Sequence, residues 1–276
     1  MNTTKKQLKD EKILNKHNLN GYIPSPDDAR DYTLAMAGVM DEEEFPEEYR
    51  TEGQVTVLDQ GSVGSCVAHA IATAMAYGEF KAGRTKYTDW SRGFIYGNRR
   101  LTDFQAEGMI TRQALKQVHH EGDCLYTTFP YNETYPKVKA RIEKNSDKYH
   151  TEAANYKIKN YFRCITEEEV KRAIMKQGAV VLGMTVYSSF QKNVPLPTSN
   201  DISRGGHAMC CVGWNKDGWI IQNSWGKYWG DKGYCYVPYE YPINEWWGIT
   251  LNDDIPEPPK TNWFVRFINW LISLFK

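Results

Sequence analysis

The sequence has no excess of either charge, because 34 lysine and arginine residues balance 34 aspartate and glutamate residues in 276 positions. It also has no stripe of basic side chains interleaved with aromatics, the pattern that follows a nucleic-acid backbone. These two absences exclude nucleic acid as a partner held by electrostatics. The remaining composition, 41% hydrophobic and 25% charged, is that of an ordinary globular enzyme with one large or two small cores.

An apolar segment is missing from the amino-terminal residues MNTTKKQLKDEKILNK, which are too charged for the core of a secretory signal peptide. We therefore expect a protein that is cytoplasmic, or released without such a signal, with its six cysteines reduced. Cysteine and histidine positions also lack the paired spacing, with a tight turn between pairs, that zinc sites use. The sequence predicts no metal and no other cofactor.

Two segments far apart in the chain carry the residue types of nucleophilic catalysis. QGSVGSC ends at Cys66, and GGHAMCCVGWNKDGWIIQNSWGKYWGDKGY contains His207 and Asn223. Cys66 opens the run VAHAIATAMAY, which favours a helix because it is rich in alanine and contains neither proline nor glycine. We therefore expect the thiol at a helix N-terminus, where unpaired N–H groups and the helix dipole favour the thiolate.

Acyl-transfer chemistry assigns a role to each of these side chains. The His207 imidazole is expected to take the proton of Cys66 and to return it to the leaving amine. An asparagine oxygen at Asn223 accepts the second imidazole N–H and fixes the tautomer and the ring plane without adding charge. The Gln60 amide, together with the backbone N–H of Cys66, is expected to stabilise the oxyanion of the tetrahedral intermediate.

These motifs together resemble the papain-like cysteine peptidases. His207 and Asn223 follow Cys66 by 141 and 157 residues, close to the roughly 130–150 residues typical of that family. The resemblance covers about residues 45–241 and rests on Gln60, Gly64, Ser65, Cys66, Gly206, His207 and the segment NSWGKYWGDKGY that begins at Asn223. It implies an α+β fold with a helical lobe over about 60–155, an antiparallel barrel-like β lobe over about 156–250, and a cleft between the lobes.

The resemblance further implies a cysteine endopeptidase that hydrolyses protein or peptide substrates through a thioester acyl-enzyme. Trp225 resembles the family's indole that covers the Asn–His hydrogen bond, and Gly64 and Ser65 support the nucleophile. Gly108 and Gly206 are expected to present backbone to an extended substrate. Two alternatives stay open. One is a cell-wall peptide hydrolase with the same triad, and the NSWG segment argues against it. The other is a non-catalytic peptide-binding module, and the presence of all four residues Gln60, Cys66, His207 and Asn223 argues against it.

Three positions depart from the plant and animal pattern of the family. Val63 stands where those enzymes have a disulfide-forming cysteine, Val67 where they have an aromatic residue, and Gly206 where papain has an aspartate beside the histidine. A carboxylate at that last position would tune the titration of the catalytic pair. The chain is more similar to bacterial and phage members of the family.

Both flanks of the peptidase region carry separate features. We call residues 1–45 the leader. It contains GYIPSPDDARDY, which resembles the leader of bacterial papain-like peptidases, and we favour a strap packed on the domain or a partly disordered extension over a cover of the cleft. At the other end, 251–261 form a proline-rich spacer and 262–276 an amphipathic helix. From Trp263 to Lys276 this helix is too short to span a bilayer and suits a membrane surface, a partner's groove, or packing on the domain.

Several local predictions follow from periodicity and capping chemistry. Apolar spacing predicts helices within 87–100 and 109–120, and EEEVKRAIMKQGAVVLGMTVY predicts a helix capped by Thr166 and ended by Gly178, followed by a strand. Cys210 and Cys211 are expected on opposite faces of a buried strand. Cys124 is expected to be structural, as is His69, while His17, His119, His120 and His150 are assigned to surface positions.

Overall fold

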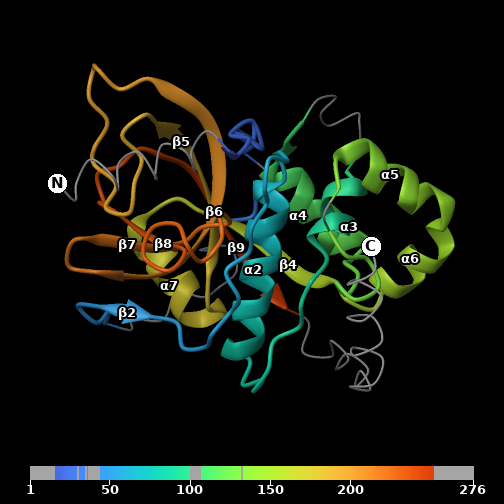
Figure 1. Cartoon of the computed structure of the whole chain (residues 1–276). Coiled ribbons are helices and arrows are strands. Elements are labelled where there is room, and N and C mark those ends of the chain that lie inside the picture. The colour runs from blue at the N-terminus through green and yellow to red at the C-terminus, as the bar shows by residue number, and fades with distance from the viewer. Residues whose placement is uncertain are drawn as a thin grey trace.

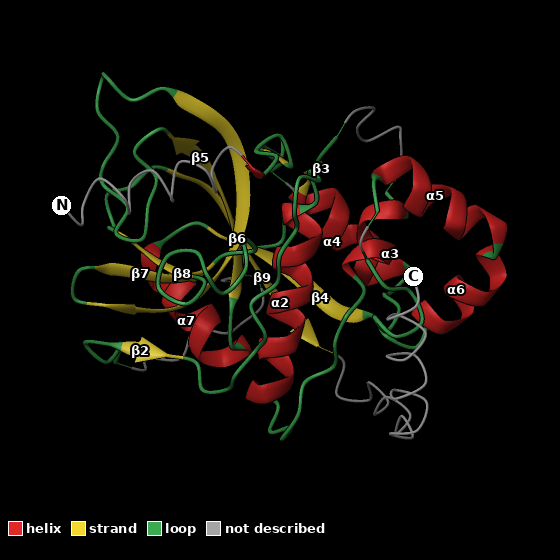
Figure 2. Cartoon of the chain, in the orientation of Figure 1, coloured by secondary structure: helices red, strands yellow, loops and turns green. Residues whose placement is uncertain are grey.

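The computed structural model describes residues 16–29, 31–34, 36, 44–99, 107–131 and 133–251. Helices gather on one side of the molecule and strands on the other, as Figure 2 shows. The helices are α2 Cys66–Lys81, α3 Arg92–Gly97, α4 Thr111–His120, α5 Tyr135–Lys144, α6 Ser146–Ala153 and α7 Glu167–Gln177. The strands are β1 Tyr22–Ile23, β2 Tyr49–Arg50, β3 Met109–Ile110, β4 Ile158–Cys164, β5 Val180–Tyr187, β6 Ser203–Asn215, β7 Gly218–Gln222, β8 Tyr234–Val237 and β9 Ile243–Leu251.

Seven strands form one antiparallel sheet in the order β4-β9-β5-β6-β7-β8, with β2 paired to β6. Strand β6 is long: its first part, from Ser203 to Cys211, pairs with β5, and its last part, from Cys210 to Asn215, pairs with β7. A separate two-stranded parallel pair joins β1 of the leader to β3 of the helical region. The predicted α+β fold, helical first and antiparallel second, is confirmed.

Helix α2 lies between the helical region and the sheet, as Figure 1 shows. Every residue from Cys66 to Glu79 is buried, because α2 packs on the sheet with one face and on other helices with another. A helix apolar on all sides is expected in such a position, and its small alanines allow close approach. This packing brings the first residue of α2, Cys66, against β6.

The sheet separates two hydrophobic clusters. One contains α2, the helical region and the inward side chains of the sheet, including Cys210; the other lies under α7 and includes Cys211 and Trp214. Because successive strand residues point to opposite faces, the neighbouring cysteines of β6 enter different clusters. The prediction for this pair is confirmed, and all six cysteines are free thiols.

The local helix predictions are largely confirmed, with shorter bounds in two cases. The helix expected within 87–100 is α3, and the one expected within 109–120 is α4, preceded by the two residues of β3. The sequence analysis predicted a helical lobe in this region but did not predict helices α5 and α6 separately. The predicted spacer, apart from Leu251 of β9, and the predicted helix at 262–276 lie outside the described residues. Within the described part of the chain, no helix is long and apolar enough to cross a bilayer. The localisation of the protein stays a prediction.

Helix α7 begins and ends as its sequence predicts. Thr166 Oγ1 accepts a hydrogen bond from Glu169 N at 3.1 Å, and three glutamates occupy the first turn, near the positive end of the helix dipole. At the other end, Gly178 has φ of 88°, a left-handed conformation that favours glycine. The β5 strand that follows therefore starts in a fixed position next to β6.

We predict that Thr166→Ala lowers the free energy of unfolding by about 1 kcal/mol, because a backbone N–H in the first turn of α7 loses its acceptor. Urea denaturation of the full chain measures the loss. Thr166→Ser keeps the hydroxyl and is expected to retain most of the stability. Equal destabilisation by the two substitutions would contradict a capping role.

Candidate active site

The site is assembled where the N-terminus of α2 meets β6. Ala208 N, on β6, donates a hydrogen bond to Cys66 Sγ at 3.4 Å, which places the neighbouring residue His207 beside the thiol. The register between β5 and β6 pairs Met184 with His207, so the position of the histidine is fixed by the sheet. The structure thus brings together two of the predicted residues that lie 141 positions apart.

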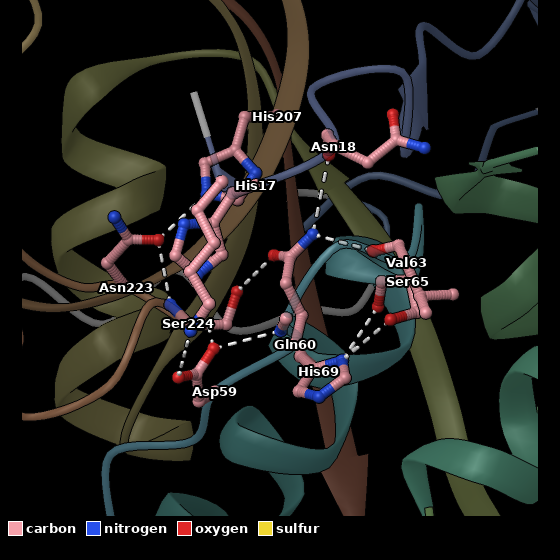
Figure 3. Close-up of polar contacts among 12 residues, drawn as sticks. His17, Asn18, Asp59, Gln60, Val63, Ser65, His69, His207, Asn223 and Ser224 are labelled. Atoms are coloured by element: carbon pink, nitrogen blue, oxygen red, sulfur yellow. Dashed lines mark hydrogen bonds and ion pairs between the residues drawn. The ribbon is translucent and has the colours of Figure 1, made fainter. Parts of the chain in front are cut away.

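The imidazole of His207 is held on one side only. Its Nε2 lies 2.7 Å from Asn223 Oδ1, which also accepts a hydrogen bond from Ser224 N at 2.7 Å (Figure 3). Since the amide oxygen is an acceptor, Nε2 carries the proton. The buried Nδ1 has no hydrogen-bond partner among the described residues. This leaves Nδ1 as the basic nitrogen, which is the arrangement expected of a general base.

Trp225 covers this hydrogen bond as the sequence suggests. Its indole stacks on the His207 ring with centroids 4.8 Å apart and an angle of 26° between the planes. Trp229 and Phe190 pack edge-on against the same indole. The aromatic cluster keeps water from the contact between His207 and Asn223, so that the imidazole orientation is maintained in a low-dielectric environment.

Gln60 lies in the same network, oriented by a residue that the sequence reasoning missed. Ser224 Oγ donates to Gln60 Oε1 at 2.8 Å, which directs the amide nitrogen toward the loop before Cys66. Nε2 then donates to Val63 O at 3.0 Å and to Asn18 O of the leader at 3.5 Å (Figure 3). The position of Ser224 directly after Asn223 is the signal that would have found it.

The loop before Cys66 has a second support. Glu107 Oε2 accepts hydrogen bonds from Gly64 N at 3.1 Å and from the Tyr96 hydroxyl at 2.5 Å. Glu107 carries no motif in the sequence, so its role emerges only from the fold.

Beneath the same loop lies a small polar network. Ser65 Oγ contacts Tyr131 Oη at 2.6 Å, while the buried His69 ring contacts Ser65 O through Nδ1 at 2.9 Å. The prediction that His69 is a satisfied structural histidine is confirmed, because its ring is engaged below the loop and not in the cleft.

The leader runs through the cleft, over the thiol. A Cβ added to Gly21 would lie 2.6 Å from Cys66 Sγ, and Met109 N donates to Gly21 O at 3.0 Å. Asn20 bridges to Gly206 of β6, and a Cβ added to Gly108 would overlap Asn20 O. The leader does pack on the domain, but the preference for a strap over a cover of the cleft is wrong, because the leader lies over Cys66. Gly108 and Gly206, which are predicted to face the backbone of a substrate, lie against the backbone of the leader, and their contact with a substrate stays a prediction.

The surface position assigned to His17 is wrong. Its side chain is 1% exposed, stacks on Trp225 with centroids 5.1 Å apart, and contacts Asp59 Oδ1 through Nε2 at 3.1 Å. The hydrogen bond from His17 holds the pKa of the Asp59 carboxyl well below its usual range. A histidine in a polar sequence is buried here because the leader carries it against the aromatic cluster.

Acidic residues of the leader pair with arginines of the domain. Asp31 contacts Arg112 twice, with Nε to Oδ1 at 2.8 Å and Nη2 to Oδ2 at 2.9 Å, and it also contacts Arg163 at 3.3 Å. Asp27 contacts Arg163 at 3.3 Å as well. Because Arg112 and Asp31 are mostly buried, and Nη2 donates a hydrogen bond in addition to the ion pair, this contact orients the leader more firmly than exposed ion pairs do.

Burial leaves both reactive groups uncharged in this arrangement. Burial raises the pKa of the Cys66 thiol to about 12, although backbone N–H groups of Ala208, Val67 and Cys66 itself act in the opposite direction. Burial also lowers the pKa of His207 to about 4, against the hydrogen bond to Asn223. The thiolate expected from the helix N-terminus is therefore not favoured while the leader covers the cleft, because desolvation outweighs the dipole.

No metal site accompanies these residues. Within the part of the chain that the structure describes, no group of three or more histidine, cysteine, aspartate or glutamate side chains is arranged to hold an ion.

Three comparisons with known proteins agree on a family. Residues 26–248 match the family described as "Papain family cysteine protease". A mimivirus protein described as "Uncharacterized peptidase C1-like protein L477" is 32% identical over 68% of this chain and 66% of that protein. A "Cysteine protease" of Blomia tropicalis is 28% identical over 69% of this chain and 60% of its own length. The chain therefore spans less than two thirds of the length of these curated relatives.

Among solved structures, xylellain, "a cysteine protease from Xylella fastidiosa", has a TM-score of 0.75 and 30% identity over 86% of this chain and 97% of its own. A procathepsin B of Trypanosoma congolense has a TM-score of 0.68 with 17% identity over 89% of this chain and 88% of its own, a likeness of fold alone.

We predict that the covered state loses stability as pH falls from 6.5 toward about 4. The pKa of His207 is lowered in the folded protein, so the contribution of the neutral ring to the free energy of unfolding is complete above pH 6.5. It is lost as the pH falls, because the unfolded or uncovered imidazole binds a proton and the buried ring does not. Thermal melting of the full chain across this range measures the loss. His207→Gln is expected to make the pH dependence shallower, with the remainder carried by His69, whose pKa is lowered by burial to about 3. An unchanged slope in that variant would contradict the assignment.

Proposed function

Because the chain belongs to the papain family of cysteine proteases, we propose that it is a cysteine endopeptidase whose cleft is closed by its own leader. The observation that carries the proposal is the His207 ring. It is held through Nε2 by Asn223, and its buried Nδ1 has no hydrogen-bond partner among the residues that the structure describes. His207 also directly precedes Ala208, whose N–H donates to Cys66 Sγ.

In the proposed reaction, His207 Nδ1 accepts the Cys66 proton, and the sulfur attacks the carbonyl carbon of the scissile peptide bond. The oxyanion that forms is stabilised by the Gln60 Nε2 donors and by the backbone N–H of Cys66. The imidazolium returns its proton to the leaving nitrogen as the carbon–nitrogen bond breaks and a thioester remains. Water, deprotonated by His207, then hydrolyses the thioester and regenerates the thiol.

The leader is proposed to make this site latent. Asn18 O lies at the Gln60 amide, and Gly21 lies over Cys66, so the positions needed by a substrate carbonyl and a scissile residue are filled. Burial under the leader also favours the neutral thiol and imidazole over the reactive ion pair. Displacement of residues 17–23 is the change that readmits both water and substrate.

A cell-wall peptide hydrolase and a non-catalytic peptide-binding module remain the other two readings of the same cleft. Experiment separates both from the proposal. A binding module has no activated thiol for an epoxide to alkylate, and a cell-wall enzyme cleaves cell-wall peptides in preference to casein.

We predict that weakening the leader in the full chain accelerates labelling of Cys66 by an epoxide directed at thiol proteases. The double substitution His17→Ala with Tyr22→Ala removes two buried leader side chains, each worth about 1.5–3 kcal/mol, so the labelling rate is expected to rise at least about tenfold. Intact mass spectrometry gives the rate, and activity on casein is expected to rise with it.

Two variants serve as controls for this measurement. Tyr32→Ala changes a leader aromatic that is 44% exposed and is expected to leave the rate as it is. Cys66→Ala is expected to abolish labelling. Absence of labelling in the leader-weakened chain would refute the peptidase proposal, and an equal rate with and without the leader changes would refute latency alone.

We predict that Gln60→Ala, made in the leader-weakened full chain, lowers kcat by about 100-fold, because loss of one oxyanion donor costs about 3 kcal/mol. Alkylation of Cys66 by iodoacetamide generates no oxyanion, so its rate is expected to change far less than kcat. The exposed Gln54 provides the control Gln54→Ala, which should change neither quantity. Parallel losses of kcat and alkylation would instead indicate that Gln60 mainly supports the loop.

A further inference from the structure

The leader is held by the domain at a second place, away from the part that lies over Cys66. Asp27 contacts Arg163 at 3.3 Å, and Asp31 contacts Arg163 at 3.3 Å and Arg112 at 2.8 Å. We call Arg112 and Arg163 the arginine clamp. Among the described residues, no carboxylate of the domain forms an ion pair with either arginine. The leader alone therefore neutralises the clamp.

The domain itself positions both arginines of the clamp. Arg112 is the second residue of α4, and its guanidinium carbon lies 5.8 Å from the centre of the Trp247 ring of β9. Arg163 of β4 pairs in register with Trp247, so the two side chains lie on the same face of the sheet. The side chains of Arg112 and Arg163 are only 14% and 19% exposed. Because they stand on a helix and a strand packed around one indole, the clamp does not need the leader for its geometry.

Backbone donors of the domain lie beside the clamp. Strand β4 is at the edge of the sheet, and Arg163 N donates a hydrogen bond to Tyr32 O of the leader at 2.8 Å. Thr33 bridges to Arg163 in a parallel arrangement. At the start of α4, Arg112 N donates to Ser25 Oγ at 3.2 Å. An edge strand with such donors can bind an extended peptide as an additional strand.

We propose that, once the leader is displaced, the arginine clamp and the edge of β4 bind an extended, acidic segment of a protein substrate. The inference rests on the proposed peptidase function and names a feature of its substrates: two carboxylates at a distance from the scissile bond. In the leader, Asp27 and Asp31 lie six and ten residues from Gly21, which lies over the thiol. Carboxylates suit the clamp because guanidinium groups form charge-assisted hydrogen bonds with them.

The leader is the first competitor of a substrate for this site. Asp27 and Asp31 belong to the same chain as the clamp, so their effective concentration at it is in the millimolar range even after residues 17–23 have left the cleft. A substrate reaches the clamp only when both carboxylates let go. An assay for the clamp must therefore remove these two charges, and restoring them should weaken the preference for acidic substrates.

The chain direction of the substrate decides on which side of the scissile bond the acidic segment lies. The leader runs parallel to β3 and bridges in parallel to β4. A substrate in the same direction has its acidic segment after the bond, and one in the opposite direction has it before the bond. Two pairs of internally quenched peptides cover both cases. All four share a sequence that the chain cuts in casein, and each pair carries either two aspartates or two asparagines on one side, at the spacing of Asp27 and Asp31 from Gly21.

The assay uses the full chain carrying His17→Ala, Tyr22→Ala, Asp27→Asn and Asp31→Asn. For one peptide pair we expect kcat/KM to be about tenfold higher with aspartate than with asparagine, the size expected for two partly buried ion pairs. The difference should lie in KM and not in kcat, because a contact remote from the scissile bond is equally strong in the ground state and in the transition state. Sodium chloride at about 0.5 M should reduce the difference by screening.

Three further variants test whether the clamp is the site. Arg112→Gln combined with Arg163→Gln removes both charges and should bring the ratio close to one. Arg50→Gln removes an exposed arginine of β2 and should leave the ratio as it is. A chain with Asp27 and Asp31 restored should show a smaller ratio, because the leader then competes with the substrate.

Asparagine peptides cut as well as aspartate peptides in both pairs, with the clamp intact, would overturn the inference while the peptidase proposal stands. This comparison needs no arginine variant and remains decisive if the doubly substituted clamp fails to fold. A ratio that survives the loss of both arginines, or that restoring the leader carboxylates leaves unchanged, would also overturn it. A chain that cuts none of the four peptides, no casein, and takes no epoxide label would overturn the peptidase proposal, and the clamp inference with it.

Discussion

The packing of α2 against the sheet is the constraint on which the site depends. Every side chain from Cys66 to Glu79 is buried between the helices and the strands, so α2 can neither rotate nor slide without opening both interfaces. Its first residue therefore meets β6 at Ala208, with His207 alongside. Rigid elements of this kind hold catalytic groups more closely than loops do. The loop before Cys66, held by Glu107 and Ser224 through Gly64 and Gln60, completes the geometry.

Water exclusion links this geometry to the control of reactivity. With the leader in the cleft, the thiol and the imidazole are both fully desolvated, and the neutral forms of both are favoured despite the dipole of α2. The contacts that hold the leader over the thiol, from His17 on Trp225 to Asp31 on Arg112, thus also disfavour the ion pair that the proposed reaction uses. Under the proposed latency, steric and electrostatic inhibition come from one segment, and its displacement reverses both.

Much of the chemistry could be predicted from local patterns. The Ala-rich run after Cys66 indicated α2, Thr166 and Gly178 marked the ends of α7, and the NSWG segment indicated Asn223 and Trp225. Glu107, Ser224 and His17 were missed, since each acts through a partner distant in the chain: Gly64, Gln60 and Trp225. His17 shows the difficulty clearly. A polar sequence context predicts exposure, but burial depends on what the segment packs against, and this is a tertiary property.

The sequence by itself determined the family, the α+β order of elements and the set of reactive side chains, because nucleophile, base and their neighbours lie in contiguous motifs whose local propensities agree with the fold. Only the tertiary structure decided where the leader lies and which protonation states its burial favours. Those outcomes depend on strand register and on desolvation. Both arise when residues far apart in the chain come together, and neither is encoded in any single segment.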